Sequence, residues 1–520
     1  MKKPRYVPII FAALFILSAM AIAVHADDGP TDKDTDQAYL GDSNDPMFRM
    51  VAAGRHHTVA IGADGSLWAW GLNADGQLGD GTALERKYPV RIGNDNDWVF
   101  ISTSNDHTMA MKSNGTLWAW GPNDKGQLGD GTTVNRNVPT PVGEDTDWKM
   151  VSAGWDHTVA TKNDNSLWAW GSNVYGQLGD GTTVNRNVPT PVEEDIEWKM
   201  VSAGRFFTAA IKDDNSLWAW GSNEYGQLSK ALTTTQETTP VRIGTDSWKG
   251  VSAAWDHAVA IKDDNSMWAW GRNSGRLGIG TNLAYEITLT RIGTDTWKIV
   301  SAGGEHTIAI RSDGTVWTWG DNGYGQAGDG SFEHRNAPVQ AGTDDNWMII
   351  TAGGWHTAAV KNDGTLMTWG WNLHGQLGNG NSGTGESRPV PSDIVFSLRI
   401  EVTTMPAKVI YTAGEPLNLT GLVITLYSGM SLTPVNGYIT DPTNGTVLNG
   451  IGTRTINVSY IEGGETLRAS FTVSVNAAAV VPEKGDPVPG GDDNTLIFVA
   501  IAAVAVIGVV AGFLFLRRKA

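Results

Sequence analysis

The chain lacks cysteine, and it has few charged and few basic residues. No cysteine occurs among its 520 residues, which excludes a disulfide framework, a thiol nucleophile and a zinc–thiolate site. Charged side chains make up 18% of the chain, against about 25% in a typical globular protein. Lys and Arg number 38 against 55 Asp and Glu, so the net charge is −17. Because polyanions are bound by Lys and Arg, this balance argues against a nucleic-acid partner.

Glycine and tryptophan, in contrast, are abundant. The chain contains 63 Gly and 23 Trp, and the glycine content is well above the usual ~7%. A chain that is rich in Gly and Trp and poor in charge is typical of an all-β protein with many tight turns. At about 150 residues per domain, the length predicts three to four domains.

Both ends of the chain carry apolar segments. Residues 1–26 are predicted to be a secretory signal peptide, with a basic start, an apolar run and a small-residue exit at Ala26; an uncleaved anchor is the alternative. Residues 495–516 carry no charge, and as a helix they would span ~33 Å, enough for a bilayer. Basic residues follow, so we expect a cytoplasmic tail at 517–520 and a single-pass protein whose ectodomain is extracellular. Residues 477–494 form a Pro/Gly-rich spacer.

A repeat of about fifty residues fills the middle of the chain. The glycine of the phrase Leu-Trp-Ala-Trp-Gly and its variants falls at 71, 121, 171, 221, 271, 320 and 370, which makes seven units. Within each unit, alternating strands flank turn dipeptides such as Asp64-Gly65 or Asp164-Asn165. Units of this size with several short strands are typical of propeller blades. We therefore expect a seven-bladed β-propeller over residues 47–396, after an acidic linker at 27–46.

The repeat signature also resembles a known family. Ser-Ala-Gly-x-x-His-Thr at 152–158, Leu-Trp-Ala-Trp-Gly at 167–171 and Gly-x-Asn-x-x-Gly-Gln-Leu-Gly-Asp-Gly at 171–181 are similar to the regulator of chromosome condensation repeat in its bacterial-type form. The resemblance implies a seven-bladed propeller. The founding nuclear member is a guanine-nucleotide exchange factor, an activity that is the least favoured here because the chain is acidic and has no long insertion. Some secreted propellers of this type inhibit β-lactamases through an aromatic loop face.

Most of the repeated aromatic and polar residues are predicted to be structural. Nineteen Trp recur at the Trp-x-Trp and unit-opening positions, and we expect them in the core. Six His occur one per unit, at 57, 107, 157, 257, 306 and 356, with Phe207 in the fourth unit. We expect each His to make a hydrogen bond within its own blade rather than to bind metal. The Gly-Asp-Gly segments are predicted turns, since one carboxylate per loop is too few for calcium.

Two dipeptides vary inside this constant text. One precedes His-Thr, and the other precedes Gly-Gln. Since they flank a hairpin, they lie at the same end of it, so we expect seven loop pairs on one face. Aromatic residues on a rigid scaffold are typical of recognition surfaces; packing into the central channel is the alternative. The candidate binding residues are Arg55, Trp155, Asp156, Tyr175, Arg205, Phe206, Tyr225, Trp255, Asp256, Glu305, Tyr324, Trp355, Trp371 and His374.

The function predicted from these features is binding rather than catalysis. We expect a cell-surface, membrane-anchored protein whose loop face binds an extracellular protein, and a carbohydrate-binding module is the alternative. No catalytic motif, metal spacing or cofactor motif is apparent. Asp156, Asp256 and Glu305 would be the acid/base candidates if the protein were a lyase or a glycoside hydrolase. Such an enzyme would combine a raised carboxyl pKa with a deep pocket.

A second domain follows the repeats. Residues 397–476 contain strand-like runs such as 422–427 and 454–460, divided by Pro, Gly and Asn turns. Their length predicts a small β-sandwich. The segment 411–422 and the run 452–458 look like bacterial immunoglobulin-like domains, which implies a spacer role; adhesion is the alternative.

Overall fold

The computed structural model describes residues 47–192, 197–394, 399–428, 431–462 and 465–477. The secondary structure of these residues consists of strands, turns and bends, without an α-helix. The predicted signal peptide, acidic linker, spacer, membrane helix and tail lie outside the described residues. Within the described residues, no helix is long and apolar enough to cross a membrane.

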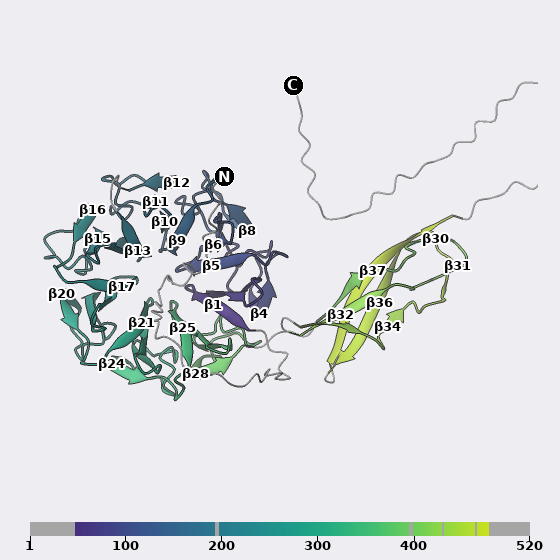
Figure 1. Cartoon of the computed structure of the whole chain (residues 1–520). Coiled ribbons are helices and arrows are strands. Elements are labelled where there is room, and N and C mark those ends of the chain that lie inside the picture. Colours follow the sequence, from purple (N-terminus) through teal and green to yellow (C-terminus); the bar gives the residue numbers. More distant parts are fainter. Residues whose placement is uncertain (1–46, 193–196, 395–398, 429–430, 463–464, 478–520) are drawn as a thin grey trace, which may run out of the picture.

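The repeats form seven four-stranded antiparallel sheets, each built from four consecutive strands. The sheets are arranged in a ring as the blades of a β-propeller (Figure 1), which confirms the predicted all-β propeller fold. The first strand of each blade is the innermost, because the last residues of several of these strands line the cavity at the centre of the ring. The inner strands are β1 (Phe48–Ala53), β5 (Trp98–Thr103), β9 (Trp148–Ala153), β13 (Trp198–Ala203), β17 (Trp248–Ala253), β21 (Trp297–Ala302) and β25 (Trp347–Ala352).

The second and third strands form the buried hairpin of each blade. Glycine or asparagine with positive φ closes the hairpin turn, for example Gly65 at 83° and Asn165 at 66°, as the turn dipeptides predict. The second strands are β2 (His57–Gly62), β6 (Thr108–Lys112), β10 (His157–Lys162), β14 (Phe207–Lys212), β18 (His257–Lys262), β22 (His306–Arg311) and β26 (His356–Lys361). The third strands are β3 (Leu67–Gly71), β7 (Leu117–Gly121), β11 (Leu167–Gly171), β15 (Leu217–Ser222), β19 (Met267–Arg272), β23 (Val316–Gly320) and β27 (Leu366–Gly370).

The fourth strand is the outer edge of each blade. Its pairing with the third strand is irregular in every blade, as between Ala69 and Gly71. Proline occupies most outer strands, where an edge position needs no ladder donor; β20 has none. The outer strands are β4 (Arg86–Arg91), β8 (Arg136–Pro141), β12 (Arg186–Pro191), β16 (Gln236–Arg242), β20 (Tyr285–Arg291), β24 (Arg335–Gln340) and β28 (Arg388–Asp393).

The repeated histidines link neighbouring blades, so the expectation of a bond within each blade is wrong. Each His Nε2 lies 2.8–3.2 Å from the Thr Oγ1 of the next blade. The Thr hydroxyl donates its proton to a backbone carbonyl, as from Thr158 to Gln127 O at 2.9 Å, so it accepts the His Nε2–H. The six pairs are His57–Thr108, His107–Thr158, His157–Thr208, His257–Thr307, His306–Thr357 and His356–Thr58.

Two further sets of hydrogen bonds join the blades. The second Trp of each pair donates its indole N–H to the preceding blade, as from Trp120 to Gln77 O at 2.9 Å. On the inner strands, a Ser hydroxyl accepts the amide of the next blade, as from Ala153 N to Ser102 Oγ at 2.8 Å. The signature residues of the repeat are therefore contacts between blades as well as core.

Fourteen of the nineteen repeated Trp are buried, and five are only partly buried. These five are the first Trp of the pair in blades two to six, and the prediction of a uniform core is therefore too simple. Their rings cover a cation at the end of the second strand. Lys162 Nζ, for instance, lies 5.0 Å from the ring of Trp148 and 4.6 Å from that of Trp168. The partly buried residues are Trp118, Trp168, Trp218, Trp268 and Trp317.

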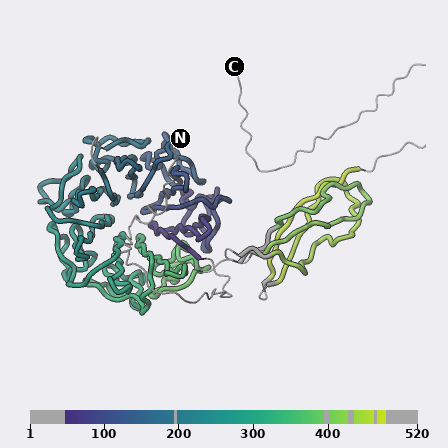
Figure 2. The backbone as a smooth tube through the Cα atoms, viewed as in Figure 1, coloured from purple at the N-terminus to yellow at the C-terminus, as the bar shows by residue number. Residues whose placement is uncertain are grey.

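The ring closes by contacts of the same kind as those between its other blades. Figure 2 shows the purple first blade beside the green seventh blade. His356 Nε2 lies 2.9 Å from Thr58 Oγ1, and Trp70 donates to Gln376 O at 2.9 Å. The first and last blades keep separate sheets, so no strand is exchanged to close the ring.

The second domain has its own hydrophobic core. A three-stranded sheet (β29–β32–β33) and a four-stranded sheet (β30–β37–β36–β34) contribute to one cluster around Ile424, Ile456 and Phe471. This arrangement agrees with a sandwich, and the immunoglobulin-like relationship stays a prediction. The strands are β29 (Arg399–Thr404), β30 (Ile410–Thr412), β31 (Glu415–Pro416), β32 (Val423–Ser428), β33 (Ser431–Val435), β34 (Ile439–Asp441), β35 (Val447–Leu448), β36 (Gly452–Glu462) and β37 (Glu465–Asn476).

Candidate functional site

The two variable loops of a blade are joined to one another by backbone hydrogen bonds. The residue after the third strand donates to the second residue of the first dipeptide, as from Ser172 N to Asp156 O at 2.7 Å and from Trp371 N to Trp355 O at 2.9 Å. The same bond is present in blades one and three to seven. In the first blade it runs from Leu72 N to His56 O. The loops therefore lie at one end of the blades, which we call the loop face.

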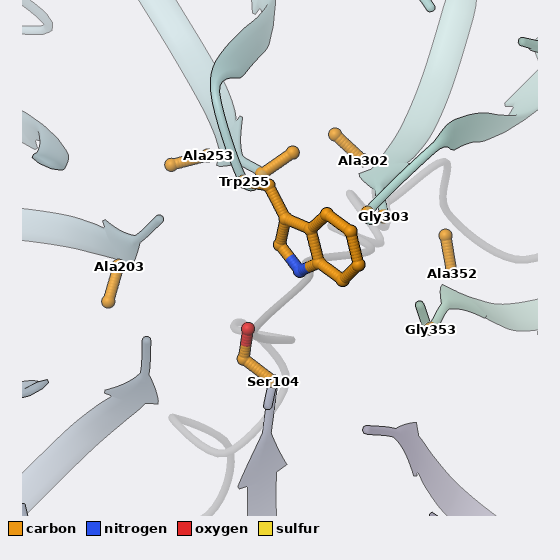
Figure 3. A pocket seen from close by; sticks show the side chains of 10 residues that line it. Ser104, Ala203, Ala253, Trp255, Ala302, Gly303, Ala352 and Gly353 are labelled. Atoms are coloured by element: carbon orange, nitrogen blue, oxygen red, sulfur yellow. The ribbon is translucent and has the colours of Figure 1, made fainter. Parts of the chain in front are cut away.

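Three tryptophans of the loop face meet across the mouth of the channel. Trp255 packs edge to face against Trp155 and Trp355, with ring centroids 5.0 and 5.2 Å apart. In Figure 3 the indole of Trp255 reaches from its blade into the centre of the ring. It packs on Gly304, where a Cβ would lie 2.6 Å from the ring. The cavity beside it measures only about 10 Å³, room for one water molecule. The three tryptophans thus fill the channel mouth, and each is still partly exposed to solvent.

Aromatic and guanidinium groups continue from this centre to the rim. Arg55 lies over Trp155 and Trp355, at 5.3 and 5.4 Å from the ring centroids. Arg205 lies over Trp155 at 4.5 Å and over Phe206 at 4.7 Å. Such cation–π contacts hold the arginines against the rings.

The rim itself exposes tyrosine. Tyr175 packs on Phe206 at 5.0 Å, and Tyr324 packs on Trp371 at 5.1 Å. Their side chains are 37% and 39% exposed, so both rings are held in place while part of each is open to solvent. Tyr225 is covered by Arg272 at 5.0 Å.

The three carboxylates that we considered as acid/base candidates do not act as one group. Asp256 pairs with Arg272 at 3.2 Å, and Glu305 pairs with Arg276. Asp156 forms no ion pair with a residue in the described ranges, and the charges that act on it are those of Asp124, Lys125, Asp106 and Arg205. Two of the three are thus neutralised by arginines of the irregular fifth unit, which leaves no geometric support for paired carboxylate catalysis.

Asp106 and Asp156 differ from the paired carboxylates. Burial raises the pKa of the Asp106 carboxyl to about 6, and Arg55 opposes that shift. Burial raises the pKa of Asp156 to about 6 as well, with a further contribution from Asp124. One oxygen of Asp106 is buried without a hydrogen-bond partner among the described residues. A raised carboxyl pKa is one feature of an enzyme site, but here it accompanies a shallow channel mouth rather than a deep pocket.

Several residues at this face were not among the predicted site residues. His56 stacks on Trp355 at 5.3 Å and also contacts Trp371 and His374, and burial lowers its pKa to about 3. His374 also pairs with Glu85 of the first blade at 2.7 Å. His56 and Asp106 occupy the same variable dipeptide as the predicted residues, so the dipeptide pattern was a sufficient signal for them. Arg272 and Arg276 were signalled only by the departure of unit five from the repeat.

Metal ligands do not gather within the described part of the chain. No group of three or more His, Asp or Glu side chains in those residues is placed to hold an ion. The side chains of the Gly-Asp-Gly segments are used locally. Asp80, for example, accepts from Thr82 N at 2.9 Å and from Arg86 Nε at 2.7 Å. These segments are turns, as predicted.

Sequence models of one repeat family match most of the propeller. The regulator of chromosome condensation (RCC1) repeat matches residues 64–111, 114–161 and 164–211, and a second model of that repeat matches 50–77, 98–127 and 149–177. The RCC1-like domain matches 193–416. The repeat at 64–111 begins in the turn after β2 and ends in β6, so the sequence repeat spans the junction between two blades.

Known proteins share the fold at low identity. The structure of human WBSCR16 aligns with a TM-score of 0.56 at 20% identity, covering 66% of this chain and 95% of that one. Prp20p from Saccharomyces cerevisiae, described with its binding to Gsp1p and histones, aligns with a TM-score of 0.57 at 18% identity, covering 67% and 87%. The ultraviolet-B receptor UVR8 of Arabidopsis thaliana is 37% identical over 68 residues, which cover 11% of this chain and 16% of the receptor.

The segments that the repeat models match include residues that join the blades. His157 and Trp170 lie in the matched segments, and each makes its hydrogen bond to a neighbouring blade. The matches run from residue 50 to residue 416, over all seven sheets of the ring. On the agreement of repeat signature and ring topology, the chain belongs to the RCC1 repeat family, and its propeller is an RCC1-like domain.

Proposed function

We propose that this protein is a non-catalytic, membrane-anchored binding protein of the cell surface, and that its loop face binds an extracellular protein. RCC1-like propellers commonly serve protein interaction. The observation that carries the proposal is the continuous network of aromatic and guanidinium groups on the loop face, from Tyr175 to Tyr324. Its side chains come from positions at which the repeats differ from one another.

The physical properties of this network favour a protein partner. Trp, Tyr and Arg dominate the binding energy of protein interfaces. Here their rings are already packed against one another, so little side-chain entropy is lost when a partner binds. The channel mouth is filled by Trp255, which leaves a broad surface rather than a pocket for a small molecule.

The location belongs to the proposal as well. It is supported by the apolar segments at 1–26 and 495–516 and by the basic residues after the second one. Residues 397–476 would then serve as a spacer between membrane and propeller.

The proposed partner can be tested with substitutions at the rim, where Tyr175 and Tyr324 are partly exposed and Tyr225 contacts one guanidinium. The rim variant carries Tyr175→Ala, Tyr225→Ala and Tyr324→Ala. The control carries Val138→Ala, Val188→Ala and Val390→Ala, three exposed residues of the outer strands. We expect wild type and control to capture the same protein from extracellular extract, and the rim variant to lose at least ten times in affinity, about 1.4 kcal/mol.

Equal capture by all three proteins, with unchanged melting temperatures, would contradict a binding role for the rim. A glycan array in parallel addresses the carbohydrate alternative, since exposed Tyr rings also stack on sugars. Binding of a glycan that the rim variant loses, without any captured protein, would favour that alternative. Substitution of Trp155, Trp255 and Trp355 is less informative, because these side chains pack across the channel and their loss would also lower stability.

A further inference from the structure

The face opposite the loop face carries a second ordered set of charges. Each inner strand begins with a bulge, and its second residue stands at the end of the strand remote from the loop face. In five of the seven blades this residue is Arg or Lys. We call these residues the basal ring, and they are Arg49, Lys149, Lys199, Lys249 and Lys298. Val99 and Met348 take the same place in blades two and seven.

The cations of the basal ring bond to neutral oxygens rather than to carboxylates. Lys149 and Lys199 donate to the amide oxygens of Asn165 and Asn215 at 2.6 and 2.8 Å. Lys249 makes the equivalent bond to Asn265, and its nearest acidic neighbours are Asp263 and Asp264. Arg49 donates to a backbone carbonyl, and Asp64 is its acidic neighbour. Within the described residues, none of the five forms a salt bridge.

Other cations on the same face are paired. Lys162 is held by Asp145 at 2.9 Å and by Asp147 at 3.3 Å. Lys262 and Lys361 are held by the equivalent loops, at 2.9 and 2.8 Å. The acidic loops between blades thus direct their carboxylates to the outer cations. In a chain of net charge −17, the five cations of the basal ring, without a salt bridge, are unusual. An anionic segment would complement their charge.

The chain itself supplies such an occupant. Residues 27–46 contain seven Asp and one Lys, a net charge of −6. They lead directly into Met47, which lies at this face because its carbonyl accepts from Ala63 N of the first hairpin turn at 2.9 Å. Arg49 of the ring follows two residues later. A segment of 20 residues reaches up to about 66 Å, and tethering at this point gives it an effective concentration in the millimolar range.

We propose that the acidic linker, residues 27–46, docks on the basal ring, at the face opposite the loop face. Its carboxylates pair with the five inner cations that the acidic loops between blades leave unpaired. The proposal is independent of the function proposed for the loop face, because it rests on the opposite end of the inner strands.

Because the chain has no cysteine, a single label can report on the linker. We suggest a nitroxide on Thr35→Cys in the full chain, kept in detergent. The ring variant carries Lys149→Gln, Lys199→Gln and Lys298→Gln, all exposed in the structure. The control removes the same charge at Lys87, Lys125 and Lys408, which lie elsewhere. We expect an immobilised label in wild type and control, and a mobile one in the ring variant and in 1 M salt, where charges are screened beyond ~3 Å.

A label that is equally mobile in wild type and ring variant would overturn the proposal, and so would one that stays immobilised in both. A second experiment separates docking of this linker from binding of any polyanion. A synthetic peptide of residues 27–46 should bind a full chain whose seven linker Asp are changed to Asn, and the ring substitutions should weaken this binding by about tenfold. Equal binding of the peptide to the unmodified chain would show that the ring is open, against the proposal.

Discussion

At the scale of single residues, the repeat signature is a set of bonds to the next blade. His157 and Thr208 form one such pair, 3.1 Å apart. The junction between blades four and five lacks both partners, because Phe207 stands at the His position and Ala258 at the Thr position. Since both members are replaced together, no buried donor or acceptor is left unsatisfied there.

The coupling of these two positions can be measured. Phe207→His alone places a buried imidazole opposite Ala258, and we expect it to lower the free energy of unfolding by about 1–3 kcal/mol. Adding Ala258→Thr supplies the missing hydroxyl and should restore much of that loss. Thermal or urea unfolding of both variants checks this expectation. Equal destabilisation by the single and the double variant would show that the pair does not act together.

Asp106 allows a test of buried charge at the loop face. Its folded-state pKa of about 6 lies above the value of 3.8 for the free group, so the ionised form costs stability at pH 7. That cost disappears as the pH falls from 6 to 3.8. We expect Asp106→Asn to raise the free energy of unfolding by about 1–3 kcal/mol at pH 7 and to have little effect at pH 4. The exposed Glu224→Gln is the control, and an equal effect at both pH values would contradict the assignment.

At the scale of elements, the fit between blades involves one glycine in six of the seven loops, whereas Ser229, with φ at 53°, takes that position in the fourth. Gly179 follows the Gly-Gln-Leu segment with φ at 79°. A Cβ on it would lie 2.6 Å from the Trp220 indole nitrogen, which donates to Gln177 O of the same loop at 3.0 Å. At this junction, Trp220 of the third strand thus packs directly on the bare backbone of Gly179 in the loop of the blade before it.

A pair of glycine substitutions separates this packing from backbone strain. Gly143 has φ at 66°, and no atom lies within 4 Å of the position that a Cβ would take, so Gly143→Ala should cost only about 1–2 kcal/mol for the left-handed conformation. Gly179→Ala has the same strain and displaces Trp220 in addition. We expect it to cost at least about 2 kcal/mol more, measured as the shift in urea midpoint. Similar costs for both would mean that the loop and the Trp can move apart freely.

At the scale of the whole molecule, the propeller is a closed ring of similar interfaces that bury six histidines. Burial lowers the pKa values of His57, His107 and His157 to about 3 and that of His306 to about 4. It also lowers those of His257 and His356 well below the usual range. Each folded-state value lies below the 6.5 of the free side chain, so the unfolded chain binds more protons at mildly acidic pH.

This difference predicts a steep acid sensitivity. Stability should be fully present above pH 6.5 and should fall between pH 6.5 and about 3, by about 1.4 kcal/mol per pH unit for each histidine. The raised pKa values of Asp106 and Asp156 act in the opposite direction between pH 3.8 and 6. They are two groups against seven, because burial also lowers the pKa of His56 to about 3. Unfolding followed by Trp fluorescence from pH 7 to pH 4 measures the slope.

The fourth junction of the ring suggests the matched variant. His157→Phe with Thr208→Ala copies the Phe207 and Ala258 pair into the third junction. We expect this double variant to fold at pH 7 and to take up one proton fewer than wild type when it unfolds at acidic pH. An unchanged slope would mean that the histidines do not control the acid transition.

Much of the fold follows from the repeat, whereas the partner of each residue does not. The alternation of apolar residues and the Asp-Gly and Asp-Asn turns predict the strands and the end of the hairpin at which the loops lie. The period of fifty residues, however, places an equivalent Thr in every blade. A bond from His157 to its own blade and a bond to the next blade are therefore indistinguishable in the sequence, and only the structure showed that Thr208 is the acceptor.

The candidate site shows the same division. The variable dipeptides identify Trp155, Trp255 and Trp355 as neighbours on one face, since strand direction alone determines at which end a loop lies. Their packing across the channel, and the pairing of Asp256 with Arg272, depend on the diameter of the ring and on side chains from different blades. The sequence by itself thus determined the blades and the composition of each face, because these depend on local backbone geometry. Which side chains meet was decided by ring closure, which brings residues a hundred positions apart into contact.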